Sequence, residues 1–172
     1  PGSPITLQPD DVVYVLDGNI TTSFTMTIGG VAGINTLFSP GASGTSGHPI
    51  TIKNYPGSTA TLTMVNGIAV NLADKDYISI VGLRGSSTET TDNHSGSFIA
   101  GNGASNTTIR SNTITGAPSA TGAGIRAVNG SDNLTIGGPL VTDGNTITQF
   151  GTGIEKGRVA LEQGDRAALM HL

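Results

Sequence analysis

The sequence predicts an all-β protein folded as a parallel β-helix of about five to six coils, with three short strands in each coil. Three observations carry this prediction. One strand pattern recurs at nearly constant spacing, a second strand pattern recurs in phase with it, and the composition is rich in glycine and poor in charge. A repeat of this length indicates stacked units, each of which buries its apolar face only against its neighbours.

The first strand pattern alternates apolar side chains with a Thr or Ser, which is typical of a strand with one buried face. Its copies are residues 23–26, 49–52, 77–80, 106–109 and 133–136. The last residues of successive copies lie 26, 28, 29 and 27 positions apart. We therefore expect one parallel sheet whose central outward column is Thr25, Thr51, Ser79, Thr108 and Thr135. The residues that follow them should stack inside, namely Met26, Ile52, Ile80, Ile109 and Ile136.

A second strand pattern follows the first by 15 to 19 residues, at residues 67–70, 97–100, 124–127 and 153–155. A weaker third series consists of Leu62, Leu83, Ile114 and Ile147. Residues 112–115 and 145–148 match closely but lie 33 positions apart, six more than the first-strand copies beside them. Insertions in solenoids fall in loops, so we expect an additional loop around residues 138–143.

The composition supports the same fold. The chain has 26 Gly among 172 residues, which suits sharp corners with positive φ, and only 12% charged residues. Like charges stacked one strand apart would repel. Length allows one domain, and we assign the β-helix to residues 4–155. Residues 1–3 are interpreted as a tag remnant. Residues 156–172 are helix-prone and are either a cap over the last coil or foreign sequence.

Several classes of function are disfavoured by simple counts. The net charge of −4 argues against nucleic acid as a partner, and the absence of Cys excludes disulfides and thiolate metal sites. No run of 18 apolar residues predicts a membrane-spanning helix. The Asp and His residues lie in expected turns without the spacing of a metal site, so we expect neither a metal nor a cofactor.

Four segments resemble successive coils of the right-handed parallel β-helix proteins of the pectate-lyase-like superfamily, nearest to its alginate lyase and chondroitinase B branch. These segments are residues 7–18, 44–57, 76–83 and 106–114. The resemblance covers residues 4–155 and extends only to the N-terminal coils of such proteins. It implies a right-handed helix, a bacterial protein outside the cell or on its surface, and contact with carbohydrate.

The lyases of that superfamily use a Lys and an Arg that lie in later coils than this chain contains, and neither can be matched here. The paired aspartates of polygalacturonases are missing as well. The resemblance therefore implies a truncated or inactive relative of polysaccharide lyases, and we lean against an enzyme.

The outward columns of the first strand give one candidate binding surface. Lys53 and Arg110 fall two coils apart in one column, roughly 10 Å from each other, with Tyr77 on the same face. Two cations near an aromatic ring suit an acidic polysaccharide. The alternative is a solvated strand face with scattered charges.

Two other functions compete with carbohydrate binding. One is a structural or adhesive surface solenoid, which self-associates through its coil ends or its C-terminal tail. The other is ice binding, which Thr-x-Thr motifs at residues 25–27, 61–63, 113–115 and 146–148 suggest. An ice-binding face needs two Thr columns in register on one sheet. The column beside Thr25 is mixed, with Lys53, Val81 and Arg110 in it, so ice binding ranks third.

Overall fold

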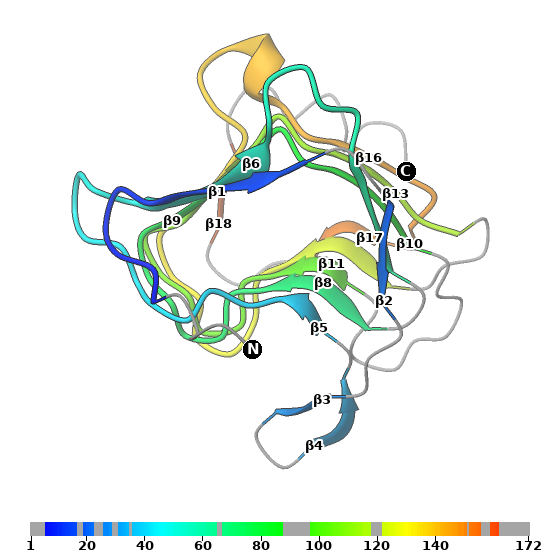
Figure 1. Ribbon diagram of the computed structural model, residues 1–172, viewed down its shortest axis with the longest axis horizontal. Helices are drawn as coiled ribbons and strands as arrows, with labels where there is room; N and C mark the ends of the chain where they lie inside the picture. The colour runs from blue at the N-terminus through cyan, green and yellow to red at the C-terminus, as the bar shows by residue number, and fades with distance from the viewer. Residues whose placement is uncertain are drawn as a thin grey trace.

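A computed structural model describes residues 6–16, 19–22, 26–28, 31–34, 36–64, 67–87, 97–117, 122–150, 152–155 and 159–161. Across these residues the chain winds as a parallel β-solenoid, which confirms the predicted fold class (Figure 1). The chain visits three parallel sheets in rotation, and the sheets enclose a common core. In this described part the helical content is a single turn of 3-10 helix, η1 (Val141–Asp143).

The three sheets contain six, five and five strands. The first sheet has the order β1 (Val12–Val15), β6 (Ile50–Asn54), β9 (Ile78–Val81), β12 (Thr108–Arg110), β15 (Leu134–Ile136) and β18 (Val159–Leu161). The second sheet has β2 (Asn19–Thr22), β7 (Thr61–Met64), β10 (Arg84–Ser87), β13 (Thr113–Thr115) and β16 (Thr146–Thr148). The third sheet has β5 (Thr36–Phe38), β8 (Ile68–Asn71), β11 (Ser97–Ala100), β14 (Ala123–Arg126) and β17 (Thr152–Glu155).

The core consists of stacked aliphatic columns, as the alternating pattern predicts. In the first sheet Ile52 pairs with Ile80 and Ile80 with Ile109, and the column continues to Ile136. All four side chains are buried, and Ile80 is 0% exposed. Since side chains alternate along a strand, the residues between them face outward. The outward register of Thr51, Ser79, Thr108 and Thr135 is therefore confirmed.

The predicted first member of this sheet is wrong. The strand beside β6 is β1, in which Val12 pairs with Thr51 and Tyr14 with Lys53. Residues 23–25 lie outside the described residues. Met26 begins β3 (Met26–Ile28), which pairs antiparallel with β4 (Val31–Ile34) in a hairpin that projects from the stack (Figure 1). The strand β1 was missed because its outward residues are apolar or aromatic rather than Thr or Ser.

The third apolar series also needs a correction at Leu83. The residue that pairs with Leu62 and Ile114 in the second sheet is Gly85. A Cβ atom on Gly85 would lie 1.9 Å from the ring of Phe98, a buried residue of β11. The ring of Phe98 thus fills the space that Leu62 and Ile114 fill in the neighbouring coils. Leu83 is buried as well, but at the preceding corner.

The tail differs from expectation where it is described. Residues 159–161 form β18 and extend the first sheet, with Val159 paired to Leu134 and Leu161 to Ile136. The composition of residues 156–172 predicted helix, but the exposed ladder of β15 offers backbone partners, and local propensity is a weak prior against such context. Residues 162–172 lie outside the described residues.

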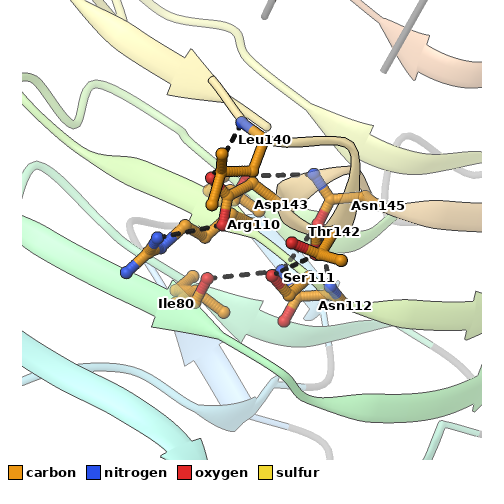
Figure 2. Close-up of polar contacts among 9 residues, drawn as sticks. Ile80, Arg110, Ser111, Asn112, Leu140, Thr142, Asp143 and Asn145 are labelled. Atoms are coloured by element: carbon orange, nitrogen blue, oxygen red, sulfur yellow. Dashed lines mark hydrogen bonds and ion pairs between the residues drawn. The ribbon is translucent and has the colours of Figure 1, made fainter. Parts of the chain in front are cut away.

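Two buried asparagines fix the corner between the first and second sheets (Figure 2). The Nδ2 of Asn112 donates to Oδ1 of Asn145 at 2.8 Å and to the carbonyl oxygen of Ile80 at 3.3 Å. The Nδ2 of Asn145 donates to the carbonyl oxygen of Ile109 at 2.9 Å. Leu83 holds the equivalent position one coil earlier, and its N–H donates to Oδ1 of Asn112. The amides therefore satisfy backbone groups that this corner would otherwise leave buried and unpaired.

Candidate functional site

The outward face of the first sheet brings the predicted cations into one column. Tyr14 pairs with Lys53, Lys53 with Val81 and Val81 with Arg110. Lys53 and Arg110 thus lie two strands apart. The column of small hydroxyl side chains, Thr51 to Thr135, runs alongside. The face therefore combines a hydroxyl row with a row that contains cations and an aromatic ring.

Tyr77 lies outside the strand column of Lys53 and Arg110. It occupies the turn before β9, with a left-handed φ of 54°. Asn106 and Asn133 occupy the equivalent turns with φ of 54° and 49°. The carbonyl oxygen of Tyr77 accepts from the N–H of Ile50, and its own N–H donates to the carbonyl oxygen of Ser105. These contacts make Tyr77 part of the corner rather than part of the strand face.

The aromatic partner of Lys53 is instead Tyr14, whose ring contacts that of Tyr55, and we call these three residues the aromatic cluster. The Nζ of Lys53 lies 5.2 Å from the centroid of the Tyr14 ring. The rings of Tyr14 and Tyr55 meet edge to face, with centroids 5.4 Å apart at 70°. Tyr14 is 42% exposed and Tyr55 is 51% exposed, so both rings remain accessible. Aromatic pairs of this geometry are attractive beyond the area they bury.

Sequence reasoning missed both tyrosines. Tyr14 joins Lys53 only because β1 pairs with β6. Tyr55 follows Lys53 by two residues and continues the outward phase of β6 past its end. Residues Val12–Val15 show no alternation of apolar and polar types, and the signal that favours a strand there is their β-branched and aromatic composition.

The charge of Arg110 is compensated. Its Nη1 lies 3.1 Å from Oδ1 of Asp143, a carboxylate whose side chain is 10% exposed (Figure 2). Asp143 also accepts from the N–H of Leu140 through Oδ2. The expected insertion forms this loop between β15 and β16, and Arg110 ties the loop to the sheet. An open depression here is lined by Thr108, Arg110, Thr135, Gly137, Gly138 and Pro139.

Lys53, unlike Arg110, has no ion-pair partner among the described residues. Among the described residues the ion pairs are that of Arg110 with Asp143 and that of His48 with Asp10, whose side chains are exposed. No described carboxylate therefore lies within ion-pairing distance of Lys53. The ammonium over the Tyr14 ring is available to an anionic ligand, and the ring holds it in place.

Other kinds of site are not found in the described ranges. No group of three His, Cys, Asp or Glu side chains among them could hold a metal ion. Nor does any helix of this part have the length and apolar character needed to cross a membrane. The outward face of the first sheet is thus the candidate site that combines aromatic rings with an uncompensated cation.

Comparisons with known proteins return no match among protein-family models, curated proteins or solved structures. The fold and the site geometry therefore carry the functional argument alone. The architecture places the chain in the broad class of parallel β-solenoids.

Proposed function

We propose that this chain binds acidic polysaccharide through the aromatic cluster of the first sheet, outside the cell or on its surface, and does not cleave it. We propose further that it is an inactive relative of polysaccharide lyases of the pectate-lyase-like superfamily. The observation that carries the binding proposal is the placement of the Lys53 ammonium over Tyr14 without a described carboxylate partner.

The cluster matches the two chemical features of a uronic acid polymer. A sugar carboxylate requires a cation, and Lys53 supplies one that is already oriented by the Tyr14 ring. An oriented side chain loses less conformational entropy on binding. The apolar faces of sugar rings suit exposed aromatic side chains, and Tyr14 and Tyr55 offer these together with two phenolic hydroxyls.

The rest of the sheet suits an extended ligand. Thr51, Ser79, Thr108 and Thr135 place hydroxyl groups at the strand spacing of about 4.8 Å along the stack. Hydroxyl groups both donate and accept hydrogen bonds, as sugar hydroxyls do. Cleavage by β-elimination needs a base and a cation that neutralises the carboxylate. Arg110 forms an ion pair with Asp143. Lys53 therefore has no described partner that could share these two roles with it.

A titration of the full chain with polygalacturonate and alginate, with dextran as a neutral polymer, tests the proposal. Lys53→Ala should weaken binding of the acidic polymers at least about tenfold, which corresponds to ~1.4 kcal/mol. Tyr14→Ala should weaken it as well. Arg84→Ala, which removes the same charge from the exposed face of the second sheet, should leave the affinity unchanged. Higher salt should weaken binding, because an exposed ion pair is screened.

The same samples also report on cleavage and on the competing function. We expect no unsaturated sugar product by ultraviolet absorbance. Product formation that disappears in Lys53→Ala would refute the claim that the chain only binds. Absence of saturable binding to both acidic polymers would refute the binding proposal and leave a structural or adhesive solenoid.

A further inference from the structure

The outward face of the second sheet carries two parallel ranks of hydroxyl side chains. In β7, β13 and β16 a Thr-x-Thr motif turns both threonines outward while Leu62, Ile114 and Ile147 point inward. The first rank contains Thr61, Arg84, Thr113 and Thr146, and the second contains Thr63, Ser86, Thr115 and Thr148. The backbone of β2 pairs with β7 in the same register, with Asn19 opposite Thr61 and Thr21 opposite Thr63.

The ranks form a regular two-dimensional array. The backbone positions of neighbouring members of a rank are separated by the strand spacing of about 4.8 Å, and those of the two ranks by two residues along the strand, about 6.6 Å. The pairings from β7 through β16 run in continuous register. The backbone therefore sets a regular repeat in two directions, and a face of an ice crystal likewise presents oxygen atoms in a regular two-dimensional lattice.

The hydroxyl groups of the second rank are held in place. The hydroxyls of Thr63 and Ser86 lie 3.2 Å apart, and that of Thr148 donates to that of Thr115 at 3.3 Å. Threonine is also stiff about χ1 because it is β-branched. Hydroxyls fixed by neighbours and by the rotamer can order water at lattice positions with little entropic cost.

We infer that this face, the hydroxyl array, binds the surface of ice crystals. From the sequence, ice binding ranked third because the second outward column of the first sheet contains residues other than Thr and Ser. On the second sheet seven of the eight described positions are Thr or Ser, and Arg84 is the exception. The array lies on a different sheet from the aromatic cluster, so the inference does not depend on polysaccharide binding.

Arg84 makes a gain of function testable. It is exposed and lies in the first rank beside Thr113. Its long charged side chain interrupts a row that would otherwise consist of threonines. Arg84→Thr should complete the row and increase the activity. Thr113→Tyr should remove the activity, because an aromatic ring at this exposed position holds the crystal away from the neighbouring hydroxyls. Thr142→Tyr, at an exposed position of η1, should change nothing.

Thermal hysteresis and inhibition of ice recrystallisation by the full chain test the inference. The expected result is measurable activity in the original sequence, an increase in Arg84→Thr, loss in Thr113→Tyr and no change in Thr142→Tyr. Absence of both activities in the original sequence and in Arg84→Thr would overturn it. Activity that persists in Thr113→Tyr would overturn the assignment to this face. Adsorption to microcrystalline cellulose without effect on ice would also overturn it, in favour of a polysaccharide crystal.

Discussion

Replacement of Ile80 with Asp should abolish folding. Ile80 is 0% exposed and lies in the core column between Ile52 and Ile109. An unpaired carboxylate at this position would have to lose its hydration without a partner, which costs several kcal/mol or forces its protonation. Domains are stable by only about 5–15 kcal/mol, so this cost removes most or all of the stability.

Ser79→Asp is the matched control for this experiment. Ser79 precedes Ile80 on β9 and points outward, where a carboxylate keeps its water. We expect Ser79→Asp to show the circular dichroism and the cooperative unfolding of the original sequence, and Ile80→Asp to show neither. An Ile80→Asp protein that unfolds cooperatively near the original melting temperature would mean that Ile80 does not face the core.

The second large effect on stability is expected at Gly85 and Phe98, where a small residue of the second sheet faces a large residue of the third. In the preceding coil a large residue of the second sheet, Leu62, goes with a small residue of the third, Ala69. On the other side of Phe98 the third sheet has Gly124, where the side chain of Ile147 from the second sheet occupies the space of a Cβ atom. In the intervening coil the order is reversed, with Gly85 on the second sheet and the buried Phe98 on the third. The same core volume is therefore filled from the opposite side.

Gly85→Leu alone should destabilise the fold by about 3 kcal/mol, the upper end of the usual cost of overpacking, since its side chain would overlap the ring of Phe98. Phe98→Ala alone should cost about 3–5 kcal/mol through the cavity it leaves. The double variant Gly85→Leu with Phe98→Ala reproduces the arrangement of Leu62 with Ala69. It should be markedly more stable than the sum of the single effects predicts. Chemical denaturation of the four proteins measures this coupling, and additive effects would contradict the proposed exchange.

The sequence predicted the fold because a strand with one buried face must alternate apolar and polar residues. The outward polar members of this alternation are Thr51, Ser79, Thr108 and Thr135. It did not predict β1, whose outward residues include Tyr14 rather than hydroxyl side chains. It also misplaced the second sheet at Leu83, because the true inward residue there, Gly85, has no side chain to continue an apolar series.

The candidate site was predictable only where it depends on strand register. Lys53 and Arg110 share a column because their strands repeat at constant spacing. The pairing of Arg110 with Asp143 depends on the conformation of the inserted loop, which no periodicity describes. The contact of Lys53 with Tyr14 depends on the unrecognised pairing of β1 with β6. Ice binding was judged on the first sheet, whereas the two ranks in register belong to the second.

Mapping of ligand-induced chemical shifts tests the binding proposal most directly. Backbone amide spectra of the isotope-labelled full chain would be recorded during titration with oligogalacturonate. We predict the largest shift changes at the aromatic cluster and at Thr51 and Ser79 beside it, and none at Thr113 or Thr146 on the second sheet. Changes confined to another sheet, or no changes at high ligand concentration, would contradict the proposal that the first sheet binds acidic polysaccharide.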